Sequence, residues 1–121
     1  MKKTVNILGN RYSVYIDVPE NKDKELSNRF GYCCPIMRKI VTVDLNTVDI
    51  WADETPYSKM VQRNTTLRHE VIHAFLYESG LWGNTLGSES WAINEEMVDW
   101  IAQQFPKILK VYKQLGCENE I

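Results

Sequence analysis

The sequence is poor in cysteine, in long apolar stretches and in net charge, and each shortage excludes a class of protein. Three cysteines are too few for a disulfide framework, and the adjacent pair Cys33 and Cys34 would strain the backbone if it formed a bridge. No stretch approaches the roughly 18 apolar residues that a membrane span needs. The lysines after Met1 lack the apolar segment that follows them in a signal peptide. We therefore expect a cytoplasmic protein with free thiols and no membrane partner.

The net charge of −2 and the pI of about 5.7 give the chain no overall field that would attract nucleic acid. Direct binding of nucleic acid is therefore not expected. Hydrophobic residues make up 44% and charged residues 25% of the chain, as in ordinary globular proteins. A length of 121 residues suits one domain with its own core, so we expect a single domain over residues 1–121.

The N-terminal half has the patterns of a small sheet. Residues 5–8 and 12–18 alternate apolar and polar side chains around Gly9-Asn10, which predicts a hairpin with a two-residue turn. The charged and polar residues 19–28 predict a surface loop. Residues 31–35 are expected to form a turn before a third, β-branched strand at 40–43.

From Pro56 onward the pattern becomes helical. Thr55 can cap a helix and Pro56 suits its first turn, while Gly80 stands where a C-terminal cap is expected. A second helix is expected from Ser88 to about residue 104, and Pro106 is expected to begin a short third one. The predicted fold class is α+β, with a small N-terminal antiparallel sheet followed by three helices.

The first predicted helix carries the motif His69-Glu70-Val71-Ile72-His73. Residues four apart on a helix lie about 40° apart around its axis and one turn along it. Two imidazoles in these positions can therefore bind one metal ion. Glu70 is offset by about 100° from His69, so it can reach a catalytic water without acting as a ligand. The apolar neighbours of the histidines predict a partly buried cleft.

A catalytic zinc ion usually has three protein ligands, and the chain has no third histidine. The second predicted helix offers Glu95 and Glu96. Glu95 shares its helix face with Val98, which must pack inward, whereas Glu96 lies on the wetter side. Glu95 is therefore the expected third ligand. Asp99 lies one turn further on nearly the same face and is expected to accept the free N–H of a ligating histidine.

These residues resemble a known family of metallopeptidases. HEVIH followed by Glu95 within NEEMVD is similar to the gluzincins, whose pattern is HExxH and then NExxxD. The resemblance implies zinc as the cofactor, Glu95 as its third ligand and Asp99 as the residue that orients a histidine. The segment after Glu95 also resembles ImmA/IrrE-type proteins, and the chain as a whole is similar to small zincin-like proteins of prophages. These resemblances imply a phage regulatory protease whose substrate is a repressor-type protein.

The expected reaction is hydrolysis of a peptide bond with Glu70 as the general base. Glu70 takes a proton from the attacking water and passes it to the leaving amine. Gluzincins of the thermolysin type use a further histidine to steady the oxyanion, and this chain has none. Tyr77 is the candidate for that role. Residues 40–43 are the candidate edge strand for an extended peptide substrate.

Three other interpretations fit the same residues. In the first, zinc only stabilises a binding module, such as a phage regulatory or inhibitor protein. In the second, the third ligand is a cysteine, as in peptide deformylases, so that Cys33, Cys34 or Cys117 replaces Glu95. In the third, the histidines bind no metal and only pack or cap the helix.

Overall fold

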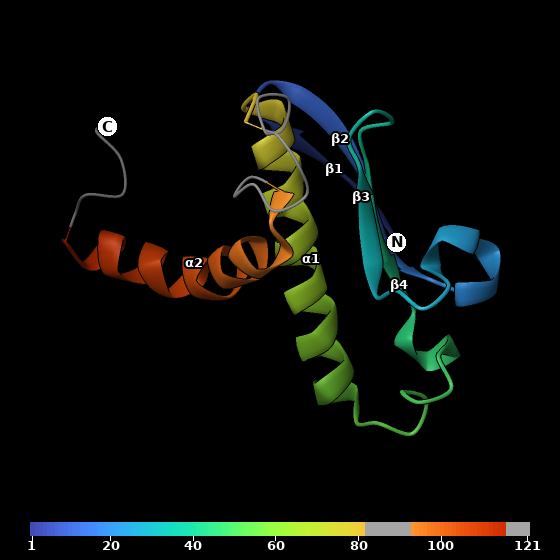
Figure 1. The fold of residues 1–121 in the computed structure, drawn as a ribbon. Helices are drawn as coiled ribbons and strands as arrows, with labels where there is room; N and C mark the ends of the chain where they lie inside the picture. The colour runs from blue at the N-terminus through green and yellow to red at the C-terminus, as the bar shows by residue number, and fades with distance from the viewer. Residues whose placement is uncertain (82–92, 116–121) are drawn as a thin grey trace.

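A four-stranded sheet followed by two helices makes up the described part of this computed structural model, residues 1–81 and 93–115 (Figure 1). The strands are β1 (Lys2–Ile7), β2 (Asn10–Val18), β3 (Gly31–Cys34) and β4 (Lys39–Val43), and the helices are α1 (Pro56–Glu78) and α2 (Glu95–Leu115). Short 3₁₀ helices cover Glu20–Lys22, Lys24–Leu26 and Leu45–Thr47. The predicted α+β class is confirmed.

The strand order β1-β2-β4-β3 makes the sheet mixed rather than antiparallel. The pairs β1–β2 and β3–β4 are antiparallel, but the central pair β2–β4 is parallel. After β2 the chain crosses to the far edge, forms β3 where a turn was predicted, and returns as β4 in the interior. The prediction that residues 40–43 form an edge strand is therefore wrong. β3 is the edge strand on that side.

The first hairpin turns one residue earlier than predicted. Ile7 pairs with Asn10, so the two-residue turn is Leu8-Gly9 and not Gly9-Asn10. Both turn residues have positive φ, 51° and 92°, as a type I′ turn requires. The N–H of Gly9 donates to Asn6 Oδ1 at 2.7 Å. This side-chain bond helps leucine occupy a backbone conformation that usually favours glycine or asparagine.

The sheet has a hydrophobic cluster on each face, because successive strand residues point to opposite sides. On the face toward α1, Ala74 of the helix packs with the buried sheet residues Ile7, Tyr12, Val14, Ile16 and Ile40. On the other face they are Leu26, Val41, Val43 and Leu45. Leu26 is fully buried within the segment that was predicted to be a surface loop. That segment therefore covers the second face of the sheet.

Helix α1 begins and ends where the sequence predicts. Thr55 Oγ1 accepts the N–H of Ser58 at 3.1 Å, and Pro56 occupies the first turn. At the other end Gly80 has a φ of +88°, and its N–H donates to the Tyr77 carbonyl at 3.1 Å. Both caps fix the length of the helix that carries the two histidines.

The last turn of α1 is also tied to the sheet. Glu78 accepts hydrogen bonds from Asn10 Nδ2 at 2.8 Å and from the Tyr12 hydroxyl at 2.9 Å. Burial, together with the neighbouring Glu78 carboxylate, raises the pKa of Tyr12, so the hydroxyl stays protonated and can donate. These bonds hold α1 in a fixed position against β2.

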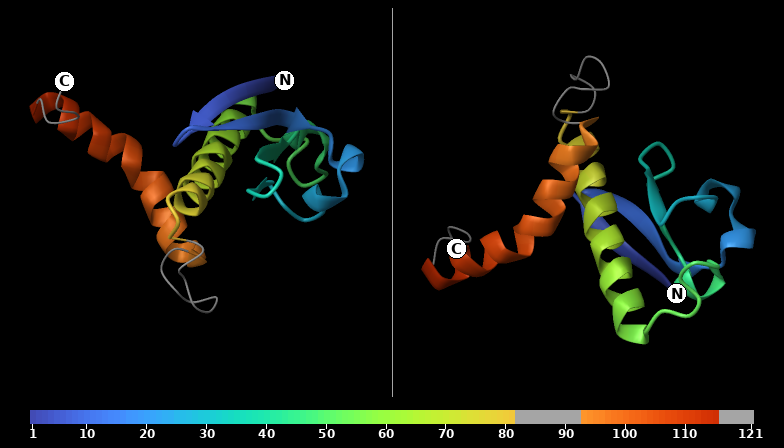
Figure 2. Two further views of the ribbon diagram at one scale, coloured as in Figure 1. Left: turned by 90° about the horizontal axis from the view of Figure 1, so that it is seen from above. Right: turned by 60° about the horizontal axis from the view of Figure 1, so that its bottom comes forward.

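Helix α2 runs without interruption through Pro106, so the predicted division into two helices is wrong. The expected start at Ser88 lies outside the described residues. Pro106 lies inside this helix and is exposed, and α2 continues past it to Leu115. Val98 and Ala102 are buried, whereas the C-terminal half of α2 projects away from the sheet (Figures 1 and 2).

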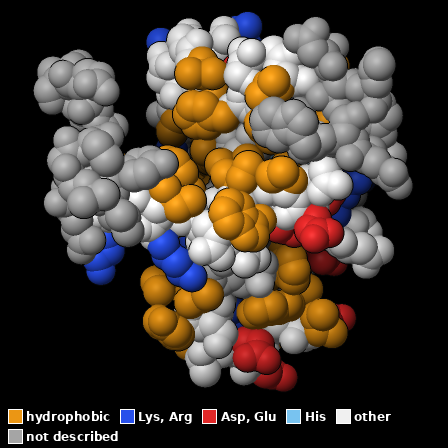
Figure 3. Space-filling model, turned by 60° about the vertical axis from the view of Figure 1, so that its left-hand side comes forward, with side chains coloured by type: hydrophobic (Ala, Val, Ile, Leu, Met, Phe, Trp, Pro, Cys, Tyr) orange, Lys and Arg blue, Asp and Glu red, His pale blue; other side chains and the backbone are white. Residues whose placement is uncertain are grey.

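Where the two helices meet, their facing sides form an apolar groove of about 370 Å³. Figure 3 looks at this side of the molecule, and hydrophobic side chains gather on it. The groove lining includes Leu67, Val71, Ile72, Phe75, Ala102 and Phe105. Neither helix in the described ranges has the length and apolar character to cross a membrane.

Candidate metal centre

The two histidines of the motif face one another on α1. His69 Nε2 and His73 Nε2 are 3.0 Å apart. Their side chains are only 18% and 10% exposed, since the sheet and α2 flank this part of the helix. Glu70 joins them in a group whose candidate ligand atoms all lie within 4.8 Å of one another. The helical spacing therefore produces the convergence that the motif predicts.

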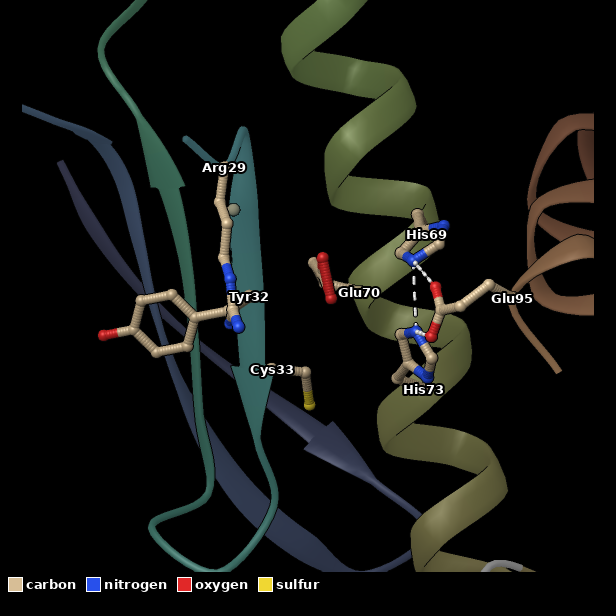
Figure 4. A pocket seen from close by; sticks show the side chains of 8 residues that line it. Arg29, Tyr32, Cys33, His69, Glu70, His73 and Glu95 are labelled. Carbon is tan, nitrogen blue, oxygen red and sulfur yellow. Dashed lines mark hydrogen bonds and ion pairs between the residues drawn. The ribbon is translucent and has the colours of Figure 1, made fainter. Parts of the chain in front are cut away.

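The first residue of α2 completes this group. Glu95 Oε2 lies 3.1 Å from His69 Nε2, and Glu95 Oε1 lies 3.2 Å from His73 Nε2 (Figure 4). The Glu95 carboxylate thus spans both imidazoles. Among the described residues that line the cavity here, Glu95 is present and Glu96 is not. The structure accordingly brings together the three predicted ligands.

The spacing and chemistry of these groups fit a metal ion. Ligands about 2.0–2.1 Å from a tetrahedral zinc ion lie about 3.3–3.4 Å from one another. The three contacts of 3.0–3.2 Å are within a few tenths of an ångström of that value. Two imidazole nitrogens and one carboxylate are also a known ligand set of catalytic zinc sites. The groups need little movement to hold a divalent cation.

Asp99 lies behind His69, as predicted. Its Oδ1 is 2.5 Å from His69 Nδ1. This arrangement suits the tautomer in which Nδ1 donates to Asp99 and Nε2 keeps a lone pair for a metal. Burial lowers the pKa of His73, which favours its neutral form. Neutral imidazole is the form that binds a metal ion.

Glu70 points to the other side of the site, toward β3. It is only 7% exposed. Burial raises its pKa to about 7, although the charges of His69 and Arg29 act in the opposite direction. A carboxyl group with this pKa can both accept and return a proton near neutral pH. This property suits the role of a general base.

An open cavity of about 390 Å³ separates β3 from this face of α1. The lining residues are Arg29, Gly31, Tyr32, Cys33, His69, Glu70, His73 and Glu95. Figure 4 shows Cys33 of β3 pointing across the gap toward Glu70 and the histidines, whereas the Tyr32 ring points away from them. Sequence patterns did not indicate Arg29 or Tyr32, because nothing local marked residues 31–34 as a strand beside the motif.

Gly31 explains why β3 can lie so close to α1. A Cβ atom at this position would be 2.5 Å from the Val41 carbonyl oxygen and 2.7 Å from Thr66 Cγ2. Both distances are far below van der Waals contact, so any larger residue would push the strand away. This glycine was the one available signal that a strand approaches the helix here.

Two further predicted residues are placed differently. Tyr77 is not among the described residues that line the cavity, and it lies near Tyr12 instead. Cys33, one of the alternative ligands, does reach the cavity wall. Burial raises the pKa of Cys33 to about 12, so it is a neutral thiol in the absence of a metal. Cys117 lies outside the described residues.

The fold and this site define an α+β domain with a candidate metal centre between its two helices. The ligand set comes from α1 and the start of α2, and β3 forms the opposite wall. Comparison of the chain with protein-family models, curated proteins and solved structures finds no match. The chemistry of the site is therefore the main guide to function.

Proposed function

We propose that this chain is a zinc-dependent peptidase of the cytoplasm. The observation that carries the proposal is the convergence of His69, His73 and Glu95 within 3.0–3.2 Å of one another, with Glu70 buried beside them in the wall of an open cavity. The resemblance to the gluzincin pattern HExxH and NExxxD supports the same function. It also implies a repressor-type protein as the substrate.

Each residue of the site has a role in this proposal. His69, His73 and Glu95 would hold the ion, and Asp99 would fix the orientation of His69. A bound zinc ion would supply a Lewis acid and lower the pKa of a water molecule. Glu70 accepts the proton of the attacking water and then donates it to the leaving amine.

The edge strand β3 provides a place for an extended peptide. Within the described residues, only β4 pairs with β3, so the other side of β3 is open to an added strand. Gly31, Tyr32 and Cys33 line the same cavity as Glu70. A peptide bound along β3 would therefore pass in front of the candidate metal centre. In this proposal β3 takes the substrate-binding role that the sequence analysis gave to residues 40–43, which lie in the interior strand β4.

The decisive experiment compares the wild-type chain with Glu70→Gln. Both proteins are loaded with zinc and incubated with a broad peptide library. The substitution should reduce cleavage by about 10²- to 10⁴-fold, because it removes the general base. The zinc content should stay the same, since Glu70 is not a proposed ligand. Glu54→Gln is the matched control, because Glu54 is exposed and outside the cavity lining.

Two outcomes would contradict the proposal. Cleavage by Glu70→Gln at the wild-type rate would rule out this role for Glu70. Absence of zinc-dependent cleavage by the wild-type chain, together with a large stabilisation by zinc, would favour a zinc-stabilised binding module. One observation favours that second candidate: Tyr77, the predicted oxyanion stabiliser, is not among the cavity-lining residues.

The position of Cys33 keeps the cysteine-ligand alternative testable. Cys33→Ser removes the thiol with little change in volume. If Cys33 were a ligand, the substitution would release zinc, whereas we expect zinc binding to remain unchanged. Inductively coupled plasma mass spectrometry of the purified variants gives the metal content directly.

A further inference from the structure

A second cavity of about 250 Å³ lies next to the candidate metal centre. It shares four lining residues with the first cavity, namely Arg29, Gly31, His69 and Glu70. Its other lining residues are Phe30, Gln62, Thr65, Thr66 and Asp99. The second cavity thus continues the first along α1 toward the N-terminus of the helix. A substrate at the metal centre would place a neighbouring side chain in it.

Arg29 stands at the junction of the two cavities. Within residues 1–81 and 93–115, its guanidinium forms no hydrogen bond or ion pair. Figure 4 shows this side chain alongside β3, across the cavity from Glu70. By contrast, Arg63 of α1 forms an ion pair with Asp17 at 3.4 Å. Arg29 is therefore a cation that faces the cavities with its hydrogen-bond donors available.

The carboxylates near Arg29 either contact the histidines or lie too far from its guanidinium to form an ion pair. Asp99 contacts His69 Nδ1, and Glu95 contacts both imidazoles. No ion pair within 4.0 Å joins Arg29 to Glu70, although they line the same cavities. The positive charge of Arg29 is thus not neutralised by direct contact with the cavity wall.

The remaining polar groups of the second cavity restrict what Arg29 can recognise. The hydroxyls of Thr65 and Thr66 donate to helix carbonyls at 2.9 and 3.0 Å. Gln62 uses one amide N–H for Thr66 Oγ1 at 3.3 Å and has a second N–H to offer. The available donors are therefore the Arg29 guanidinium and one amide N–H. A group that only accepts hydrogen bonds, such as a carboxylate, matches this set.

We propose that the second cavity is a specificity pocket for an acidic side chain of the substrate, and that Arg29 binds its carboxylate. The acidic residue would be adjacent to the scissile bond, because the pocket shares Glu70 and His69 with the metal centre. The position of the scissile bond rests on the proposed peptidase function. Binding of a carboxylate by Arg29 does not depend on catalysis.

The first experiment measures selectivity with peptide pools that carry Glu, Gln or Lys at each position in turn. The wild-type chain should prefer Glu over Gln at one position by about 10- to 100-fold, the range of a charge-assisted hydrogen bond. Arg29→Gln should abolish that preference, and Arg29→Glu should reverse it toward Lys. Arg11→Gln is the matched control, because Arg11 is exposed on β2 and outside both cavities.

The second experiment measures binding without catalysis. Amide NMR spectra of the zinc-loaded chain are recorded with N-acetyl-glutamate α-amide and with N-acetyl-glutamine α-amide. The glutamate probe should shift the resonances of residues 62–66, and Arg29→Gln should abolish these shifts while zinc stays bound. Circular dichroism checks that the variant is folded.

The two experiments separate the failure of the pocket from the failure of the peptidase. If the chain cleaves no peptide but binds the glutamate probe through Arg29, the pocket stands and the peptidase proposal fails. If the chain cleaves peptides with the same selectivity in the wild type and in Arg29→Gln, the pocket proposal is overturned. Equal binding of the two probes, or binding that survives Arg29→Gln, also overturns it.

Discussion

Helices α1 and α2 contribute to the same site in different ways. His69 and His73 on α1 are 18% and 10% exposed, whereas Glu95 and Asp99 on α2 are 67% and 55% exposed. Helix α1 packs against the sheet through the fully buried Ala74, so its histidines are fixed by the core. The acidic half of the site instead depends on how α2 docks. The two histidines are therefore held by the core, whereas the two carboxylates are held only by the packing of α2 on α1.

This difference has an energetic consequence for metal binding. The N-terminal half of α2 packs on α1 through Val98 and Ala102, while its C-terminal half projects from the body (Figure 2). A metal ion held by His69, His73 and Glu95 would join the two helices directly. Its binding free energy would then stabilise the docked position of α2, because the undocked state lacks one ligand. The core between the sheet and α1 should respond much less to metal.

The largest expected effect comes from removing the α2 ligand. Glu95→Ala should lower zinc affinity by more than about 100-fold, beyond the range typical of residues that only support a ligand. Competition with a fluorescent zinc chelator measures this change. Glu96→Ala is the neighbouring control and should leave the affinity unchanged, since Glu96 does not line the cavity. If the two variants lost affinity equally, the assignment of Glu95 as the ligand would be wrong.

A smaller effect is expected for the residue that orients His69. Asp99→Asn keeps the size of the side chain but removes the charge that faces His69 Nδ1 at 2.5 Å. Zinc affinity should fall by about 10- to 100-fold, and one ion per chain should still bind. Asp53→Asn serves as the control, because Asp53 is exposed and lies outside the cavity lining. An unchanged affinity for Asp99→Asn would mean that α2 supplies one functional carboxylate and not two.

The α1 half of the site was also the part that sequence could predict. Caps at Thr55 and Gly80 and the four-residue spacing of the histidines are local signals, and the helix follows them. Glu95 was chosen over Glu96 from helical angles, and the structure brings it to the histidines. Helix geometry gives the directions of the histidines and of Glu95 on their own helices, whereas their meeting depends on how α2 packs against α1.

The position of β3, which lines the cavity opposite α1, could not be predicted from local sequence patterns. β3 was expected to be a turn because Gly31 and the adjacent cysteines have no strand pattern, and its position follows from a long crossover in the chain. Gly31 is needed for contact with Thr66, which is distant in sequence. Arg29, which comes just before β3, lines the same cavity as Glu70 because of this crossover. Proline usually ends or kinks a helix, but α2 continues through Pro106, so this local signal did not predict the boundary.

The smallest effect should come from the contact that holds α1 to the sheet. Tyr12→Phe removes the hydroxyl that donates to Glu78 Oε2 at 2.9 Å and leaves the bond from Asn10. We expect a loss of about 1.5–3 kcal/mol in the free energy of unfolding of the zinc-free chain, as for a hydrogen bond to a charged acceptor. Urea denaturation measures this loss. Zinc affinity should not change, because the ring still fills the core and α1 keeps its position in the folded state. A fall in affinity as large as that of Asp99→Asn would show that the histidines are not fixed by the core, and that both halves of the site depend on docking.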